Sequence, residues 1–304
     1  MKIAARPPWL RKQKQLTPEV MRTRRRIGGL GLHTVCESAR CPNLGECYAC
    51  GNATFLILGD HCTRNCAFCA VEHGPSPLPD PLEGQKIADY TASNRIRYAV
   101  LTSVTRDDLA DGGASHYVRV VEDLRRLVPA LKIELLVPDF AGRADAIEEV
   151  ARLPIQVFAH NMETVRELYG RVRRGADYQR SLEVLKIAAS TRNNRESSKA
   201  TSRKPRSFTR EGPRIKSGIM VGLGETEEQL QRLFDDLAAV PVEILTIGQY
   251  LQPSKFNAPV HRYYYPDEYK LLREKALACG IRHVVAGPYV RSSYLAEGAY
   301  RGSL

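Results

Sequence analysis

Seven of the chain's eight cysteines lie within 34 residues, and six of these constrain the fold more than any other feature. They divide into two groups of three: Cys36, Cys41 and Cys47, spaced C-x4-C-x5-C, then Cys62, Cys66 and Cys69, spaced C-x3-C-x2-C. An apolar stretch at 53–58 separates the groups and predicts a short buried strand. The second group therefore lies on the loop that leaves this strand.

From the residues alone, three interpretations of these triplets stay open. Disulfides are disfavoured because no apolar secretory segment precedes the cysteines, which is typical of a reducing compartment. Structural zinc takes four ligands, usually as two C-x2-C-like pairs, whereas each group here stops at three. Three thiolates on a four-iron cluster leave one iron free for another ligand, so the spacing favours an iron–sulfur cluster.

The C-x3-C-x2-C spacing, with Phe68 before the last cysteine, resembles the signature of radical S-adenosylmethionine (SAM) enzymes. The stretch from Cys36 to Cys47, followed by residues 53–60, resembles the lipoyl synthase family within that superfamily. Further stretches that agree are 101–109, 111–113, 136–140, 160–163, 174–178, 220–225, 248–253 and Arg291-Ser-Ser-Tyr294. The resemblance extends from residue 7 to residue 295, which is nearly the whole chain.

This resemblance implies two [4Fe–4S] clusters and SAM as cofactors. The radical SAM cluster would be held by Cys62, Cys66 and Cys69, and an auxiliary cluster by Cys36, Cys41, Cys47 and Ser293. The former cleaves SAM to a 5′-deoxyadenosyl radical, whereas the auxiliary cluster supplies sulfur and is consumed. A serine ligand suits a cluster that is dismantled, because an alkoxide matches iron less well than a thiolate does. Arg291 is a weaker candidate for holding the auxiliary cluster or the substrate.

Three residues are candidate SAM contacts by the same resemblance: Phe68, Asn161 and Gly222. Glu163 is a weaker candidate, and Asn161 and Glu163 equally fit the cap and first turn of a helix. Glycine allows a ligand to approach the backbone closely, although any strand-to-helix turn carries glycines as well. Weaker candidates for the methionine end of SAM are Thr102, Ser103, Asp107 and Asp108.

Apolar runs alternate with amphipathic stretches across residues 53–278. The expected strands are 54–58, 98–104, 133–137, 156–159, 218–222 and 244–249, and the expected helices lie near 84–95, 114–127, 143–152, 163–169, 178–190, 225–239 and 267–278. This alternation predicts an α/β fold with a parallel sheet, and six units predict a partial (β/α)6 TIM-type barrel with its chemistry at the carboxyl ends of the strands. Radical SAM resemblance implies the same barrel. The expected division is an arm at 1–52 with the auxiliary-cluster cysteines, the barrel at 53–260, and a helix with a cluster-capping segment at 261–304.

The chain's net charge of +11 is concentrated in two segments. Residues 1–26 carry +8 and residues 190–214 carry +6, so the remainder is slightly acidic at −3. Two interpretations remain: solvated charged segments, or attraction to an acidic partner that rising salt would weaken. Residues 190–214 have almost no apolar side chains, which predicts a mobile surface insertion on the side away from the active site.

A few features outside these motifs also carry expectations. Residues 18–26 predict a short helix in the N-terminal arm, and Trp9 is expected to anchor that arm. Cys50 and Cys279 are expected to be structural, with Cys279 a small buried side chain near a helix end. No apolar run reaches the roughly 18 residues of a membrane helix, which favours a cytoplasmic protein without a membrane contact.

The lipoyl synthase resemblance implies a sulfurtransferase that inserts two sulfur atoms at carbons 6 and 8 of a protein-bound octanoyl-lysine. These carbons are unactivated, so their hydrogens require a radical rather than a side-chain base. Implied partners are octanoylated lipoyl domains (the glycine cleavage H protein and 2-oxoacid dehydrogenase acyltransferase subunits) and an electron donor such as flavodoxin or ferredoxin, with no nucleic acid. The alternatives are another sulfur-inserting radical SAM enzyme of the methylthiotransferase type, or a zinc-binding nucleic-acid module.

Overall fold

The computed structural model describes residues 5–12, 16–199 and 212–302 and is built around one curved sheet. The sheet's strands, in spatial order, are β1 (His33–Thr34), β2 (Thr54–Ile57), β5 (Tyr98–Ser103), β6 (Lys132–Leu136), β7 (Val157–Ala159), β8 (Arg214–Val221), β9 (Ile244–Gln249) and β10 (His283–Gly287). All neighbours from β2 to β10 pair in parallel, and β1 pairs antiparallel with β2. Among the described residues no strand pairing joins β10 to β1 or β2, so the barrel is open.

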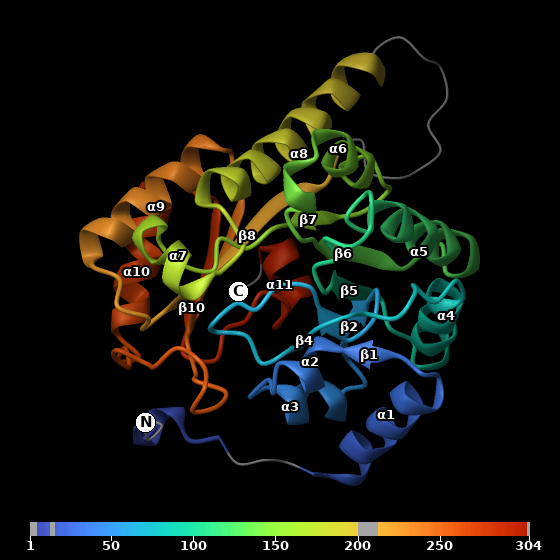
Figure 1. The fold of residues 1–304 in the computed structure, drawn as a ribbon, viewed down its shortest axis with the longest axis horizontal. Coiled ribbons are helices and arrows are strands. Elements are labelled where there is room, and N and C mark those ends of the chain that lie inside the picture. Colours follow the sequence, from blue (N-terminus) through green and yellow to red (C-terminus); the bar gives the residue numbers. More distant parts are fainter. Residues whose placement is uncertain (1–4, 13–15, 200–211, 303–304) are drawn as a thin grey trace.

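The strands are buried because helices cover the outside of the sheet (Figure 1). All six residues of β9 and all four residues of β2 are buried. A strand that is buried on both faces tends to be a nearly continuous apolar run, as in β2 (Thr-Phe-Leu-Ile). The partial α/β barrel that the sequence predicts is therefore confirmed, with its six expected strands in place.

The helices form the outer layer and the two extensions. They are α1 (Pro18–Gly29), α2 (Val35–Ser38), α3 (Leu44–Ala49), α4 (Glu83–Ser93), α5 (Ala114–Leu127), α6 (Ala144–Ala151), α7 (Tyr169–Val172), α8 (Tyr178–Lys199), α9 (Glu227–Ala239), α10 (Glu268–Ala278) and α11 (Ala296–Arg301), with 3-10 turns at Pro8–Leu10, Phe140–Gly142 and Arg166–Leu168. Local sequence sets several of their starts. Thr17 caps α1 ahead of Pro18, and Thr226 forms a capping box with Gln229 at α9.

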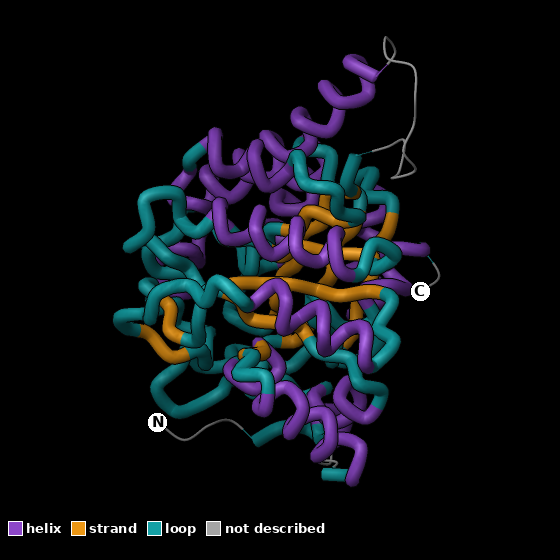
Figure 2. Tube along the Cα trace, turned by 90° about the vertical axis from the view of Figure 1, so that its right-hand side faces the viewer, coloured by secondary structure: helices purple, strands orange, loops and turns teal. Residues whose placement is uncertain are grey.

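Three expectations need correction. The segment 261–304 also contributes β10, a seventh parallel strand that extends the sheet beyond β9. The expected helix at 163–169 is instead a short 3-10 turn followed by α7. The helix expected at 178–190 instead continues to Lys199, into the segment expected to be a mobile insertion, and extends beyond the rest of the helical layer (Figure 2). Residues 200–211 lie outside the described part of the chain.

The C-terminal segment returns to the inside of the barrel, where Figure 1 shows α11 within the curve of the sheet. Tyr300 packs against Tyr98 at the start of β5, with their ring centroids 5.9 Å apart. The guanidinium of Arg214, at the start of β8, donates to the Tyr300 carbonyl at 2.6 Å. These contacts lie at the amino ends of the strands, so α11 fills the end of the barrel opposite the loops that follow the strands.

The N-terminal arm is fixed to the body by Trp9, as the sequence predicts. Its indole Nε1 donates to the Tyr264 carbonyl at 3.3 Å, and its ring lies 4.7 Å from that of Tyr265. Cys50 is exposed at the end of α3, and Cys279 is half-buried at the end of α10. The expectation of a buried Cys279 is therefore wrong.

Candidate cluster and cofactor site

Two short helices present the first cysteine triplet. Cys36 lies on α2, Cys47 lies on α3, and Cys41 lies in the turn between them. Thr34 caps α2 by accepting from the Glu37 amide, which fixes the start of this unit next to β2. Burial raises the pKa of the Cys36 thiol to about 12, and the neighbouring Cys41 and Cys47 thiols raise it as well. The three thiols are thus close enough to act on one another.

The Arg291-Ser-Ser-Tyr294 segment lies against this triplet although it is about 250 residues away in sequence. Burial lowers the pKa of Arg291, and the nearby Cys41 thiol opposes that shift. The hydroxyl of Tyr294 donates to Glu46, the residue before Cys47, at 3.3 Å. Asn43 donates to the Tyr289 carbonyl at 2.7 Å and so fixes the start of the same segment. Ser293 lies in the chain between Arg291 and Tyr294, and its role as a cluster ligand stays a prediction.

The second triplet lies on the loop after β2, as predicted, with Cys62 at the end of the two-residue strand β3 (His61–Cys62). Strand β3 pairs with β4 (Glu72–His73), which closes the cysteine loop at its base. The Cys62 sulfur accepts from the backbone amides of Arg64 and Thr105, each at 3.4 Å. Amide donors of this kind stabilise a thiolate and tune a cluster that it binds.

Loops from the far side of the barrel hold the rest of this cysteine loop. The Ala67 amide donates to Val172 at 2.9 Å, and the Ala67 carbonyl accepts from the Ala258 amide at 2.7 Å. The Asn257 side chain donates to the Cys69 carbonyl at 2.7 Å. Burial raises the pKa of Cys66 to about 11 and that of Cys69 to about 12, and thiols of the same triplet raise both further.

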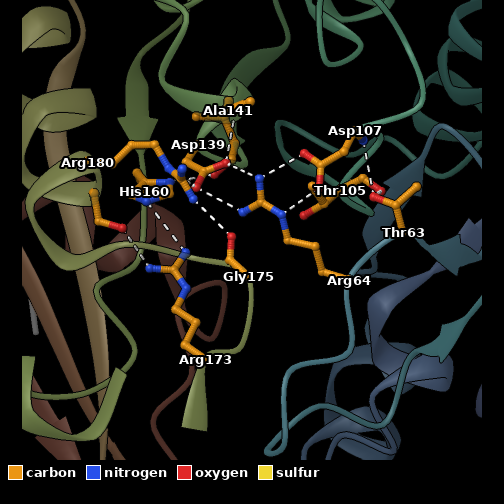
Figure 3. Close-up of polar contacts among 12 residues, drawn as sticks. Thr63, Arg64, Thr105, Asp107, Asp139, Ala141, His160, Arg173, Gly175 and Arg180 are labelled. Atoms are coloured by element: carbon orange, nitrogen blue, oxygen red, sulfur yellow. Dashed lines mark hydrogen bonds and ion pairs between the residues drawn. The ribbon is translucent and has the colours of Figure 1, made fainter. Parts of the chain in front are cut away.

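Arg64, inside the C-x3-C-x2-C motif, joins this loop to two strand ends (Figure 3). Its guanidinium donates twice to Asp107, at 2.7 and 2.8 Å, and also contacts Asp139 at 2.8 Å. Asp139 is fully buried and receives a second guanidinium from Arg180 at 2.7 Å. Desolvation alone would raise the pKa of Asp139, but Arg64 and Arg180 outweigh it and hold that pKa well below its usual range. Bidentate pairs of this type fix geometry as well as charge.

The predicted SAM contacts Asn161 and Glu163 lie at the carboxyl end of β7, where the Asn161 amide donates to Glu163 at 3.0 Å. Asn161 is not a helix cap, because the next helical turn begins at Arg166. Glu163 has a left-handed backbone, with φ of +64°, and bridges in parallel to Ile219 of β8. Burial raises the pKa of the Glu163 carboxyl, and the nearby Arg173 lowers it. The Oδ1 of Asn161 accepts from the Ser292 hydroxyl at 2.9 Å.

The other candidates have mixed surroundings. Phe68 is a half-buried member of the cysteine loop and packs against the core. A Cβ on Gly222, which has φ of +99°, would lie 2.5 Å from the Arg262 carbonyl and would overlap the Gln249 amide. Protein atoms thus occupy the space beside Gly222, and its contact with SAM stays a prediction.

The acidic candidates after β5 already have arginine partners. Asp107 accepts from Arg64, and Asp108 accepts from Arg106 at 2.8 Å. Asp111, Gly112 and Gly113 form the turn that the sequence predicts before α5.

The two cysteine triplets provide the type of ligand atom, thiol sulfur, that iron–sulfur clusters require. Each triplet gathers three thiols that influence one another, with backbone amides aimed at the Cys62 sulfur. In the part of the chain that the structure covers, no three His, Cys, Asp or Glu side chains converge tightly enough to hold a single metal ion. A four-iron cluster distributes its thiolates over different iron atoms and thus uses a wider ligand set.

The chain matches the family model of the radical SAM superfamily over residues 56–237. It is 46 % identical to a lipoyl synthase of Acidithiobacillus ferrooxidans over 298 residues, which cover 97 % of this chain and 88 % of that protein. It is 45 % identical to a lipoyl synthase of Caldicellulosiruptor saccharolyticus, with 96 % of each chain covered. The chain belongs to the lipoyl synthase family. Membership of the radical SAM superfamily implies a [4Fe–4S] cluster and SAM as cofactors.

Solved structures support the fold of this lipoyl synthase family member. The HydG maturase of the [FeFe]-hydrogenase superposes with a TM-score of 0.57 at 10 % identity, covering 81 % of this chain and 54 % of that one. Methylornithine synthase (PylB) superposes with a TM-score of 0.54 at 14 % identity, covering 75 % of this chain and 62 % of that one. Among the described helices none is both long and apolar enough to cross a membrane.

Sequence reasoning missed the residues that hold the site together. Asp139 lies in the quoted 136–140 stretch and Arg64 lies inside the cysteine motif, but nothing in the sequence pairs them. Ser292 received no role, although it contacts Asn161. The sequence offers one signal for such contacts: a charged residue within an otherwise apolar strand, such as Glu134 in β6 or Lys216 in β8. A charged side chain that is buried in this way needs a polar partner.

Proposed function

We propose that this protein is a sulfurtransferase that inserts two sulfur atoms at carbons 6 and 8 of an octanoyl-lysine on a lipoyl domain. The observation that carries the proposal is the pairing of two cysteine triplets, with the Arg291-Ser-Ser-Tyr294 segment against the first of them. Cys62, Cys66 and Cys69 would hold the radical SAM cluster, and Cys36, Cys41, Cys47 and Ser293 would hold an auxiliary cluster. When bound, these cofactors supply hydrogen-atom abstraction and sulfur.

The chain's own residues position those groups. The cysteine loop is held by Arg64, by the backbone of Val172 and by Asn257, which limits its movement when SAM binds. Asn161, paired with Glu163, is suited to accept or donate a hydrogen bond to the ribose of SAM. Phe68 would contribute an apolar contact to the adenine, and Gly222 would shape the adjoining turn.

The proposed partners follow from the substrate. The expected protein substrates are the octanoylated lipoyl domains of the glycine cleavage H protein and of the 2-oxoacid dehydrogenase acyltransferase subunits. The +8 charge of residues 1–26 would attract those lipoyl domains that are acidic. A flavodoxin or ferredoxin would supply electrons. We place the reaction in the cytoplasm, since reduced thiols are the norm there. The arm (1–52) would carry the auxiliary-cluster cysteines, the barrel (53–260) would carry the SAM-binding cluster, and residues 261–304 would add β10 to the sheet before capping the auxiliary cluster.

The proposed division of labour between the triplets can be tested with two cysteine variants. Cys66→Ala should abolish cleavage of SAM to 5′-deoxyadenosine, because it removes a ligand of the SAM-binding cluster. Cys41→Ala should retain that cleavage and yield no lipoyl product. Cys50→Ala is the matched control, because Cys50 is exposed and has no proposed role, so both activities should persist. Equal loss of SAM cleavage in folded Cys66→Ala and Cys41→Ala proteins would contradict these roles.

A further inference from the structure

A buried ion pair inside the barrel has no part in the chemistry described above. The Lys216 ammonium lies 2.7 Å from a Glu134 carboxylate oxygen, and each side chain is only 1 % exposed. Lys216 is on β8 and Glu134 is on β6, so the pair spans the inner face of β7. In barrels of this type, inward side chains of alternate strands meet in one layer. Burying two charges is expensive, and such a pair is expected to do more than fill space.

The remaining partners of the pair show where it acts. The Tyr98 hydroxyl donates to the second oxygen of Glu134 at 2.6 Å. Lys216 also donates to the backbone carbonyl of Ser292 at 2.6 Å. The ammonium therefore joins the barrel wall to the C-terminal segment, and Glu134 supplies its counter-charge.

Glycines on two neighbouring strands make room for this segment. A Cβ on Gly218 of β8 would lie 2.6 Å from the Ser292 hydroxyl oxygen. A Cβ on Gly248 of β9 would overlap the Val290 carbonyl oxygen. Side chains at these positions would thus expel residues 290–292 from the lumen, and the bare backbone is required there.

We propose that Lys216 is a positioning residue for Ser293, the proposed oxygen ligand of the auxiliary cluster; the inference rests on the proposed function. The Ser292 carbonyl and the Ser293 nitrogen and Cα belong to one planar peptide unit. Fixing that carbonyl on Lys216, while Asn161 fixes the Ser292 side chain, sets the direction in which Ser293 leaves the barrel wall. A weakly bound alkoxide gains most from such preorganisation, because the protein rather than the metal bond then holds the ligand in place.

The test is the double variant Lys216→Met/Glu134→Gln in the reconstituted holoenzyme. It removes both charges at similar volume, which avoids an unpaired buried ion. Hydrogen exchange of residues 289–301 should accelerate at least tenfold, and the Mössbauer component of the oxygen-ligated iron should be lost. SAM cleavage should stay within twofold of the wild type, whereas sulfur insertion falls at least tenfold.

Lys275→Met/Glu227→Gln is the matched control. It makes the same chemical change in a surface pair between α10 and α9, and should leave every readout unchanged. If the Met/Gln protein does not fold, Lys216→Gln/Glu134→Gln retains hydrogen-bonding groups while the shorter side chain no longer reaches Ser292.

Two outcomes separate the inference from the proposed function. Unchanged exchange and an unchanged iron signature in a folded double variant, with an active wild type, would overturn the role of Lys216 alone. A wild type that lacks an oxygen-ligated iron and inserts no sulfur would overturn the proposed function, and the inference with it.

Discussion

At the scale of single residues, Arg64 shows how a cysteine motif acquires a fixed geometry. A loop with three thiols has few backbone hydrogen bonds of its own, so its shape depends on side chains that reach other elements. Arg64 contacts Asp107 and Asp139, which follow β5 and β6, and only 10 % of its side chain is exposed. The loop is thus fastened to the ends of two strands in the barrel wall.

Arg64→Ala should lower stability and the yield of the SAM-binding cluster. The change leaves the buried Asp139 with Arg180 as its remaining guanidinium, and breaking a buried pair of this kind costs about 3 kcal/mol. We expect a lower unfolding temperature and less iron per chain after reconstitution. Lys270→Ala is the control, because the Lys270 pair with Asp267 is exposed and should contribute little. Equal iron content and equal unfolding temperatures in both variants would contradict the role of Arg64.

His160 carries the clearest pH dependence. Its Nδ1 lies 2.9 Å from the Val137 carbonyl oxygen, which can only accept a hydrogen bond. Its Nε2 faces the Arg173 guanidinium, which can only donate one. Nδ1 therefore bears the proton and the ring is neutral. Burial lowers the pKa of His160 to about 3, and the positive charge of Arg173 lowers it further.

The sign of the effect follows from proton binding. Below the unfolded pKa near 6.5, the unfolded chain takes up a proton at His160 that the folded chain does not, so stability falls as pH falls from about 6.5 towards 3. At pH 5.5 the free energy of unfolding is lower by about 1 kcal/mol for this reason. His160→Gln should weaken that pH dependence relative to the wild type, measured as unfolding temperature between pH 8 and pH 5.5. An identical pH slope in the two proteins would show that His160 is not held neutral.

Sequence reasoning reaches the cysteines of this site but not their supports. Cysteine spacing is a local signal, and iron–sulfur chemistry limits what it can mean. The Arg64–Asp139 contact joins residues 75 positions apart. Nothing local distinguishes Asp139 from any polar residue after a strand, because its partners are set by the way the barrel curves.

At the scale of elements, the turn before α5 combines backbone conformation with close packing. Gly113 has φ of +92°, and a Cβ there would lie 2.5 Å from a methyl carbon of Leu58. Leu58 follows β2, so this turn seats α5 against the first barrel strand. The Asp111 carboxylate accepts from the Gly113 and Ser115 amides and closes the turn.

Gly113→Ala should destabilise the protein by about 2 kcal/mol, from backbone strain and overpacking together. Gly28→Ala is the matched control. Gly28 lies inside α1 with no atom within 4 Å of a new Cβ, so alanine there should stabilise the helix by up to about 1 kcal/mol. Chemical denaturation of the two variants measures the difference, and a Gly113→Ala protein as stable as the wild type would rule out the tight packing of this turn.

Most elements were predictable because their signal is periodic. The α5 helix and the β9 strand have the bounds that the sequence predicts. The sequence analysis does not predict strand β10. This strand is short, with five residues ending at Gly287, and it follows the helix that ends the sixth predicted strand–helix unit. Helix α8 continues to Lys199 although residues 191–199 are polar, so apolar periodicity alone does not predict where it ends.

At the scale of the whole molecule, the two ends of the chain complete the site. The arm supplies the first triplet through α2 and α3, and the C-terminal segment returns through the barrel to place Arg291 and Tyr294 beside it. The first triplet thus lies between the arm and the C-terminal segment, whereas the second lies on the loop after β2. This arrangement accounts for a family resemblance that extends over nearly the full chain.

The most direct test is mass spectrometry of an octanoyl-lysyl peptide after incubation with the reconstituted, reduced protein and SAM. The account predicts that the peptide gains two sulfur atoms and loses two hydrogens at the disulfide level, and that Cys41→Ala leaves the peptide unchanged. Formation of 5′-deoxyadenosine with no sulfur in the peptide would contradict the proposed substrate, and the absence of both products would contradict the proposed chemistry.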